Sequence, residues 1–454
     1  MVYDLIVIGG GPAGYLACER AGHGGLKTLL IEKEHIGGIC LNKGCIPTKT
    51  LLYSAKIKDS AEKGEKYGVT ARDITLDHKT VVKRKDKVVK KLTAGVRSAV
   101  KSAGCDMVDA EGIIRGKSGT GYEVEAGGQV YTGKRLLIAT GSRPCIPPIE
   151  GLTNGLESGY VVTSAELLDM EEVPEKLVII GGGIVGMEMG SYFHSAGSDV
   201  TVIEMLSRIG GNIDEEIAVL LQREYEAKGV CIVTGASVTG IKDGSVLYEK
   251  DDTVHEIQAD KVLLSTGRKA RTGGIGLETI GVAADRRGIM IDTHCLTSVP
   301  NVYAAGDVTG LCMLAHTAYR QGAAAVNHML GKPDAMHYNA IPSVIYTNPE
   351  VAAVGETAAS ARAKGLDVTE RTVSMNFSGR YMAENEGGRG LCKIFVDNRL
   401  GTLCGVHMIG NYASEVIVSA GICIEKMLTI EEIKGIVFPH PTVSEVIREA
   451  IYQI

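Results

Sequence analysis

The chain has 454 residues with a formal net charge of −6 at pH 7, and 44% of its residues are hydrophobic and 22% charged. This length is too great for one ordinary hydrophobic core and predicts several domains. The composition is typical of a globular protein, and the negative charge argues against a nucleic-acid partner. Eleven cysteines without an evident targeting signal favour a cytoplasmic protein. No apolar run reaches the ~18 residues of a membrane helix, so we expect no membrane partner.

A dinucleotide-binding signature stands at the amino-terminal end of the chain. An apolar run over 2–8 predicts a buried strand, and 15–21 predicts a helix. The glycines between them are Gly9, Gly11 and Gly14. In this signature they allow a tight turn, the approach of a pyrophosphate and close packing of helix on strand. A second predicted strand, 28–32, ends on Glu32, where a carboxylate can bind ribose hydroxyls.

The same signature recurs in the middle of the chain. Strands are predicted at 176–180 and 199–204 with a helix at 187–195 between them, and the turn glycines are Gly181, Gly183 and Gly186. Two tandem copies are far more specific than one and predict two bound dinucleotides. Glu204 would repel a 2′-phosphate, which favours NAD over NADP, although Arg208 follows four residues later.

Cys40 and Cys45 are separated by four residues. A regular helix would place their Cα atoms at least ~7.5 Å apart, whereas a disulfide needs about 4.4–6.8 Å. A bond between them would therefore require a backbone that departs from a regular helix. The pair is either two unrelated buried thiols or a redox-active disulfide, and the neighbouring nucleotide signatures favour the second interpretation.

A histidine near the carboxyl-terminal end has the surroundings of a general base. His440 lies between Pro439 and Pro441, which restrict its backbone, and Glu445 follows near the start of a predicted helix over 443–451. A carboxylate bound to one ring nitrogen fixes the tautomer and leaves the other nitrogen to accept a proton. An isolated histidine is more often structural, but beside two nucleotide sites and a cysteine pair a catalytic base is favoured.

The segment 61–104 is strongly charged and predicts a helix with one apolar face. Its basic run, 83–87, is expected on the solvated side of that helix. Docking of an acidic partner to this run is the less favoured alternative.

The whole chain resembles the pyridine nucleotide–disulfide oxidoreductases, and within them the branch that oxidises dihydrolipoyl groups. The motifs that carry the resemblance are the segment 40–49, the two glycine turns, Gly306-Asp307, Leu314-Ala315-His316 and the segment 440–445. The resemblance implies an α/β fold with two tandem Rossmann-like dinucleotide-binding domains and an α+β C-terminal dimerisation domain. The implied boundaries are 1–145 for the first part of the FAD-binding domain, 146–267 for the NAD-binding domain, 268–338 for the second, central part of the FAD-binding domain, and 339–454 for the dimerisation domain.

The resemblance also implies roles for individual residues. Cys40 would exchange with the dithiol substrate, and Cys45 would contact the flavin. His440, oriented by Glu445, would act as the base on the cysteines of the other subunit of a homodimer. Lys49 would lie near the flavin and pair with Glu188; without the resemblance, the two would be interpreted as an ordinary lysine and glutamate on helix surfaces. The FAD-binding residues would be Gly9, Gly11, Gly14, Glu32, Lys49, Thr140, Gly141, Asp307, Ala315 and His316. The NAD-binding residues would be Gly181, Gly183, Gly186, Glu204 and Gly267. No metal is expected.

The implied activity is oxidation of protein-bound dihydrolipoyl groups to the lipoyl disulfide, with reduction of NAD+ to NADH. The partner would be the lipoyl domain of a 2-oxo acid dehydrogenase or glycine cleavage complex. The first alternative is an NAD(P)H-dependent reductase of another low-molecular-weight disulfide. The second is a flavin-bearing scaffold or redox sensor without turnover.

Overall fold

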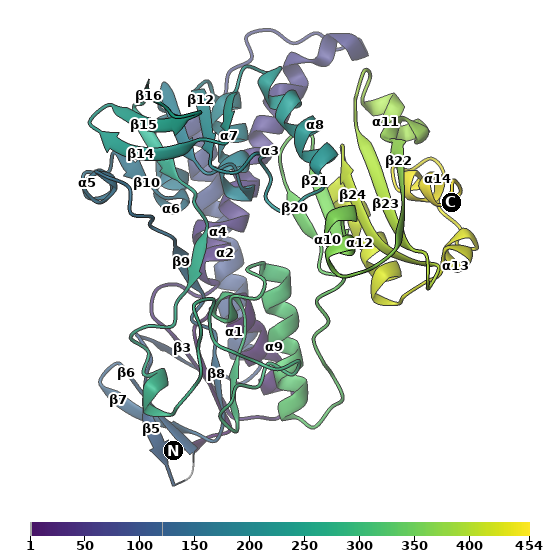
Figure 1. Ribbon diagram of the computed structural model, residues 1–454. Helices are drawn as coiled ribbons and strands as arrows, with labels where there is room; N and C mark the ends of the chain where they lie inside the picture. Colours follow the sequence, from purple (N-terminus) through teal and green to yellow (C-terminus); the bar gives the residue numbers. More distant parts are fainter. Residues whose placement is uncertain (1, 120) are drawn as a thin grey trace. The chain divides into compact units, whose positions relative to one another are not determined.

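The computed structural model describes residues 2–119 and 121–454, and the chain folds into two compact units (Figure 1). The first unit comprises Met1–Thr50, Lys83–Cys145 and Gly267–Met336, and the second comprises Leu51–Val82, Ile146–Thr266 and His337–Ile454. Helices α3 (Cys45–Glu62) and α4 (His78–Ser102) each contribute residues to both units. Among the described residues, no helix combines the length and apolar character needed to cross a membrane.

The first unit is built on a five-stranded parallel sheet. Its strand order is β19 (Val302–Ala304), β8 (Leu136–Ile138), β2 (Leu5–Ile8), β3 (Thr28–Glu32) and β4 (Asp106–Asp109). All four residues of β2 are buried, as expected for a central parallel strand that is covered on both faces. Helices α1 (Pro12–His23) and α9 (Ala315–Met329) pack against each other beside this sheet.

The predicted strand 2–8 is two strands. Residues Val2–Tyr3 form β1, which joins a second sheet in the order β1, β7 (Gln129–Gly133), β6 (Gly121–Ala126) and β5 (Ile113–Ser118). The interruption falls at Asp4, whose carboxylate accepts hydrogen bonds from the Lys27 amide (3.0 Å) and the Lys134 ammonium (2.8 Å). This side chain needs polar partners, so the chain changes sheets there instead of continuing as one buried strand.

A parallel sheet also forms the nucleotide-binding part of the second unit. Its order is β10 (Val161–Val162), β17 (Lys261–Leu264), β11 (Lys176–Ile180), β12 (Asp199–Glu204) and β13 (Cys231–Thr234). The predicted limits of β11 and β12 are confirmed. Helices α7 (Ile184–Ala196) and α8 (Glu215–Glu226) accompany this sheet, and β14 (Ser237–Lys242), β15 (Ser245–Lys250) and β16 (Thr253–Gln258) form an antiparallel sheet beside it.

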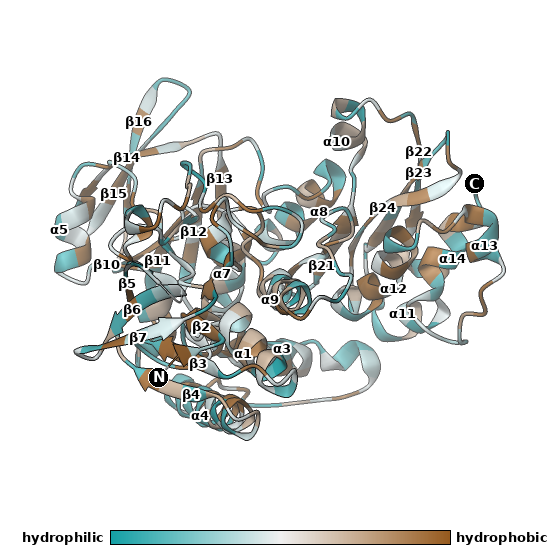
Figure 2. Ribbon diagram, turned by 90° about the horizontal axis from the view of Figure 1, so that it is seen from below, coloured by the Kyte–Doolittle hydropathy of each residue, from teal (hydrophilic) through white to brown (hydrophobic). Residues whose placement is uncertain are grey.

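The carboxyl-terminal part of the second unit contains a five-stranded antiparallel sheet. Its order is β20 (Ser343–Ile345), β21 (Val351–Gly355), β24 (Thr402–Ile409), β23 (Leu391–Asp397) and β22 (Val368–Ser374). Helix α12 (Ala413–Glu425) packs on β21 and β24, and α14 (Glu445–Ile451) packs on β22 and β23. Figure 2 shows that much of α12 is hydrophobic, and this helix exposes Val418 and Ile422 in addition to burying Val416, Ile417 and Ala420.

The remaining strands and α-helices are short. They are β9 (Ser142–Pro144), paired with β18 (Arg268–Ala270), and the helices α2 (Gly38–Lys43), α5 (Leu152–Glu157), α6 (Ser164–Asp169), α10 (Ala358–Ala363), α11 (Gly379–Glu384) and α13 (Ile430–Lys434). The predicted helix over 61–104 begins only at His78, after a 3-10 turn at Gly64–Tyr67. The prediction that the run 83–87 is solvated is wrong at Lys85. Its side chain is buried and pairs with Asp86 at 3.0 Å, which keeps the buried charge neutralised.

Candidate active site

The two cysteines of the predicted redox pair lie on either side of a helix break. Cys40 belongs to α2 and Cys45 is the first residue of α3, with Gly44 between the helices at φ −151° and ψ −105°. The Asn42 side chain donates to the carbonyl oxygen of Gly38 (2.9 Å) within α2 and to that of Ile36 (3.1 Å), which anchors α2 to the turn before it. The predicted departure from a regular helix between the cysteines is therefore present.

The two thiols are close to each other. Both side chains are half-buried thiols, and they are hydrogen-bonded to one another. This bond and burial raise the pKa of Cys40, while the nearby Lys49 ammonium acts in the opposite direction. Two sulfurs in hydrogen-bonding contact can form and break a disulfide with little movement of the backbone.

The first glycine turn leaves room for a ligand at one position. Gly9 has φ +106°, and a Cβ there would lie 2.2 Å from the Ala139 carbonyl oxygen. At Gly14 a Cβ would lie 1.8 Å from the Gly9 oxygen. At Gly11, by contrast, the nearest atom would be 4.0 Å away, at the Cα of Gly38. The chain itself therefore requires the outer two glycines, whereas the middle one borders open space at the N-terminus of α1, where a pyrophosphate fits.

The second glycine turn repeats this arrangement. A Cβ at Gly181, which has φ +104°, would lie 2.6 Å from the Ser265 oxygen, and one at Gly186 would lie 2.0 Å from the Gly181 oxygen. A Cβ at Gly183 would meet no atom within 4 Å. The N-terminus of α7 thus offers the same opening for a second dinucleotide.

The acid at the end of each second strand is held by backbone amides. In both units two backbone amides donate to this carboxylate. One belongs to the second residue of the glycine turn, and the other belongs to the residue two positions after the acid. The donors are Gly10 (2.6 Å) and Glu34 (2.7 Å) for Glu32, and Gly182 (2.7 Å) and Leu206 (2.8 Å) for Glu204. Each carboxylate therefore has a fixed position beside its turn, and its remaining lone pairs can accept hydrogen bonds from ribose hydroxyls.

Asp307 lies in a polar cluster with Ser142 and Arg268, two residues that were not predicted from the sequence. The Ser142 hydroxyl donates to Asp307 (2.5 Å), and the Arg268 guanidinium donates to the hydroxyl (2.7 Å) and carbonyl (3.0 Å) of Ser142. Burial lowers the pKa of Arg268, and the neighbouring Asp307 carboxylate opposes this shift. Their place in the sequence could have identified these two residues, because Ser142 directly follows Gly141 and Arg268 directly follows Gly267, and both glycines were predicted to bind a nucleotide.

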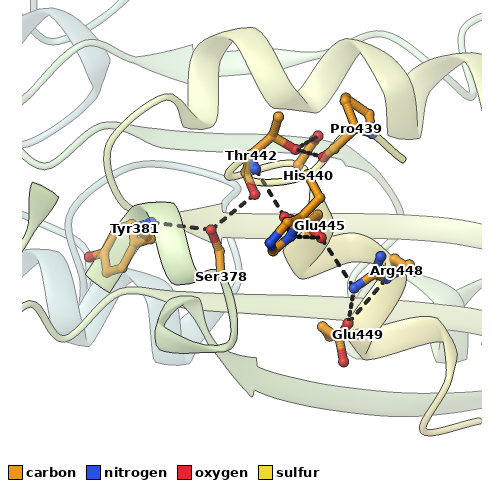
Figure 3. Close-up of polar contacts among 9 residues, drawn as sticks. Ser378, Tyr381, Pro439, His440, Thr442, Glu445, Arg448 and Glu449 are labelled. Carbon is orange, nitrogen blue, oxygen red and sulfur yellow. Dashed lines mark hydrogen bonds and ion pairs between the residues drawn. The ribbon is translucent and has the colours of Figure 1, made fainter. Parts of the chain in front are cut away.

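Glu445 and His440 form the predicted dyad (Figure 3). The His440 Nδ1 lies 3.0 Å from the Glu445 carboxylate, which also accepts from the Thr442 amide (2.9 Å) and pairs with Arg448 (3.2 Å). The Thr442 amide above all, with His440 and Arg448, holds the pKa of Glu445 below its ordinary value. The Glu445 side chain is 3% exposed and that of His440 is 76% exposed, so the ring is held at one nitrogen and open at the other. Arg448, three residues after the acid on α14, was missed.

The other predicted residues occupy several positions. Glu188 is buried on α7 and accepts a hydrogen bond from the Tyr346 amide (2.9 Å), while Lys49 is half-buried on α3. The ion pair between Lys49 and Glu188 stays a prediction. Ala315 and His316 begin α9. Thr140 donates to the carbonyl of Arg271 (2.8 Å), and Gly141 and Gly267 have φ of +74° and +94°.

Known proteins match the chain over almost its full length. A family model described as pyridine nucleotide-disulphide oxidoreductase matches residues 3–322, and a model of the dimerisation domain of the same family matches residues 341–451. A dihydrolipoyl dehydrogenase of Thermus scotoductus is 40% identical over 99% of this chain and 96% of that relative. One from Mycoplasma pneumoniae is 38% identical over 99% of this chain and 98% of that relative.

A solved structure has the same fold. The HOCl-induced flavoprotein disulfide reductase RclA from Escherichia coli superposes with a TM-score of 0.86 at 26% identity, covering 100% of both chains. The family models, the full-length relatives and the tandem nucleotide turns agree. The chain belongs to the pyridine nucleotide–disulphide oxidoreductase family.

Proposed function

We propose that this protein oxidises protein-bound dihydrolipoyl groups to the lipoyl disulfide and reduces NAD+ to NADH, with FAD as its bound cofactor. The observation that carries the proposal is the pair of hydrogen-bonded thiols, Cys40 and Cys45, at a helix break directly after a dinucleotide turn. The full-length relatives from Thermus scotoductus and Mycoplasma pneumoniae, both named dihydrolipoyl dehydrogenase, support the choice of substrate.

The dyad and the cysteines supply the thiol chemistry. Because Glu445 occupies Nδ1 of His440, the exposed Nε2 is the nitrogen that removes a proton from the substrate dithiol. The resulting thiolate attacks Cys40 of the Cys40–Cys45 disulfide, and Cys45 leaves as a thiolate. The second substrate thiol then attacks the substrate sulfur of the mixed disulfide, which closes the lipoyl disulfide, and its proton passes to the Cys40 sulfur that leaves. The substrate loses two electrons, and the cysteine pair gains them.

The two glycine turns hold the nucleotides. Bound FAD supplies the chemistry that connects a dithiol to a nicotinamide. The openings at Gly11 and Gly183 accept the pyrophosphates of FAD and NAD, with Glu32 and Glu204 binding the ribose hydroxyls. The fixed negative charge of Glu204 disfavours the 2′-phosphate of NADP. Asp307, oriented by Ser142, binds the ribityl chain of FAD.

The proposal includes a homodimer with a shared active site. The match to a dimerisation domain over residues 341–451 supports the dimer, and the exposed ring of His440 supports its action on the cysteines of the other subunit. The domain boundaries proposed are those that the resemblance implies, at 145, 267 and 338. We place the protein in the cytoplasm, because an odd number of cysteines, eleven, in a chain of this length is typical of a reducing compartment. The partner is the lipoyl domain of a 2-oxo acid dehydrogenase or glycine cleavage complex.

The test is reduction of NAD+ and of NADP+ by the purified yellow protein supplied with dihydrolipoamide. We expect rapid reduction of NAD+, loss of that reaction in Cys45→Ser, and normal activity in Cys231→Ser, which alters an exposed cysteine of β13. Absence of turnover with dihydrolipoamide, together with rapid NADPH oxidation by another small disulfide, would contradict the proposed substrate.

A further inference from the structure

Helix α4 is strongly basic in a protein that is acidic overall. Its 25 residues include nine lysines and arginines and a single acid, Asp86, whereas the whole chain has a net charge of −6. Asp86 pairs with the buried ammonium of Lys85 at 3.0 Å. The one negative charge of this helix is therefore already balanced, and the exposed lysines of α4 have no acidic side chain on the same helix to neutralise them.

Four of these lysines form a stripe along α4. Lys83, Lys87 and Lys91 follow one another at intervals of four residues, and these spacings place them on one side of the helix. Lys90, three residues after Lys87, lies on the same side. All four are exposed, and their side chains form no ion pair or hydrogen bond within the part of the chain that the structure describes. Lysines four residues apart repel one another, so this lysine stripe does not stabilise α4 itself.

The lysine stripe starts beside the helix that carries Cys45. The guanidinium of Arg84, next to Lys83, donates a hydrogen bond to the carbonyl oxygen of Thr50 on α3 at 3.2 Å. Thr50 lies five residues after Cys45 on the same helix, a distance of ~7.5 Å along the helix axis. The stripe and both redox cysteines also belong to the first compact unit. A partner that binds along the stripe therefore lies next to the segment that carries the thiols.

We propose that the lysine stripe is the docking surface for an acidic face of the folded domain that carries the dihydrolipoyl group. This inference rests on the proposed function and adds the surface by which that partner is recognised. Charge complementarity favours this occupant. An acidic domain is repelled by the chain as a whole, with its net charge of −6, and is attracted where four unpaired ammonium groups lie together.

The stripe acts on the encounter between the two proteins and leaves the thiol chemistry unchanged. Attraction between opposite charges raises association rates by about 10- to 1,000-fold, and salt screens this effect. Free dihydrolipoamide is an uncharged amide, so its rate of binding gains nothing from the lysines. The carried and the free forms of the substrate therefore differ in the property to which the stripe responds.

The experiment compares these two forms of the substrate in the FAD-loaded protein. NAD+ reduction is measured with free dihydrolipoamide and with a purified, reduced lipoyl domain of net negative charge, taken from a 2-oxo acid dehydrogenase complex. The salt concentration is varied from about 20 to about 300 mM, which shortens the screening length severalfold. In wild-type protein we expect kcat/KM for the domain to fall as salt rises, and kcat/KM for dihydrolipoamide to stay constant.

The decisive variant is Lys87→Glu/Lys91→Glu, which reverses two charges of the stripe. At low salt we expect kcat/KM for the lipoyl domain to fall about tenfold or more, because attraction becomes repulsion. The kcat at saturating domain and the kcat/KM for dihydrolipoamide should keep their wild-type values. The matched control is Lys117→Glu/Lys242→Glu, which makes the same change of net charge at exposed lysines of β5 and β14.

Each other outcome counts against the stripe. Equal losses in the two double variants would assign the effect to net charge, and a wild-type rate with the domain in Lys87→Glu/Lys91→Glu would overturn the inference. That second result would do so even if duplex DNA or phosphatidylserine vesicles bound the wild type and not this variant. If free dihydrolipoamide is not oxidised at all, the proposed function fails and this inference with it. Oxidation of dihydrolipoamide without any effect of the variant on the domain would overturn the inference alone.

Discussion

The carboxylate of Glu445 lies 3.0 Å from Nδ1 of His440, and this buried acid is itself held by a backbone amide and a guanidinium. An ionised acceptor at Nδ1 requires the proton to be on that nitrogen, which leaves Nε2 unprotonated in the neutral ring. The imidazole therefore has one defined orientation and one defined tautomer before any substrate arrives.

Replacement of His440 by alanine should remove the base for the dithiol. We expect the rate of NAD+ reduction by dihydrolipoamide to fall by about 100- to 10,000-fold. NADH oxidation by an artificial one-electron acceptor needs only the nucleotide sites and should continue at the wild-type rate. Full dithiol-dependent turnover in His440→Ala would exclude this histidine as the base.

Neutralising the acid of the dyad should have a smaller effect on the same reaction. In Glu445→Gln the side chain keeps its shape but loses the charge that stabilises a protonated imidazole. We therefore expect the rate of NAD+ reduction by dihydrolipoamide to fall by about 10- to 100-fold. Glu449→Gln is the matched control, because Glu449 pairs with Arg448 at 2.6 Å but does not contact His440. Equal losses in the two variants would indicate a general effect of charge on α14.

The open position in the second glycine turn can be tested without disturbing the fold. Because a Cβ at Gly183 would meet no protein atom, Gly183→Ala should keep wild-type thermal stability and FAD content. The methyl group would enter the space for the NAD pyrophosphate, and we expect the KM for NAD+ to rise about tenfold or more. Gly186→Ala, with its contact at 2.0 Å, should lower the unfolding temperature instead. An unchanged KM in Gly183→Ala would argue against binding at this turn.

A buried ammonium joins three acids in the second unit. Lys393, 6% exposed, lies 3.0 Å from Asp214, 3.1 Å from Glu216 and 2.9 Å from Glu370. Burial alone would lower the pKa of Lys393, but the three carboxylates raise it overall. Lys393→Met should lower the free energy of unfolding by ~3–5 kcal/mol, since it leaves a buried carboxylate unpaired.

The control for that variant is an ion pair in the same unit whose ammonium is exposed, between Lys364 and Glu356. Lys364→Met removes a 61% exposed ammonium and should cost less than ~1 kcal/mol. Urea unfolding followed by circular dichroism measures both changes. If Lys393→Met lowered the free energy of unfolding no more than Lys364→Met does, the ion pairs of Lys393 would contribute little to stability.

His407 should make the protein sensitive to acid. Burial lowers its pKa from an ordinary 6.5 to about 4, and its Nε2 has no hydrogen-bond partner among the described residues. The unfolded chain therefore binds a proton that the folded chain rejects between these pH values, and stability falls as the pH drops through this window. The loss attributable to His407 is up to ~3 kcal/mol. His407→Gln should show a flatter dependence of the unfolding free energy between pH 6.5 and 4. A dependence as steep as that of the wild type would assign the acid sensitivity to other groups.

Local sequence patterns were enough to predict the parts of the site that lie close together along the chain. The two glycine turns, the acids that end β3 and β12, and the His440–Glu445 dyad each involve residues separated by a few positions or by one strand–helix–strand unit. Such features depend on apolar periodicity and on conformations that only glycine adopts easily, and both are visible in the sequence.

Contacts across long stretches of chain could not be predicted in the same way. Arg268 and Ser142 are 126 residues apart, and Tyr15 and Tyr319, whose hydroxyls form a hydrogen bond, are 304 apart. Their meeting depends on how strands and helices pack, which no local pattern encodes. The division of the first predicted strand at Asp4 was missed for a related reason, because its polar partner Lys134 comes from a distant segment.

The helix break at Gly44 gives the two sulfurs different electrostatic surroundings. Cys45 opens the 18-residue helix α3, where the helix dipole places a partial positive charge, whereas Cys40 lies inside the short helix α2. Negative charge on the reduced pair is consequently favoured at Cys45, which agrees with the proposed exchange of the substrate dithiol at Cys40. In that proposed mechanism, one glycine between two helices separates the sulfur that holds the charge from the sulfur that exchanges with the dithiol.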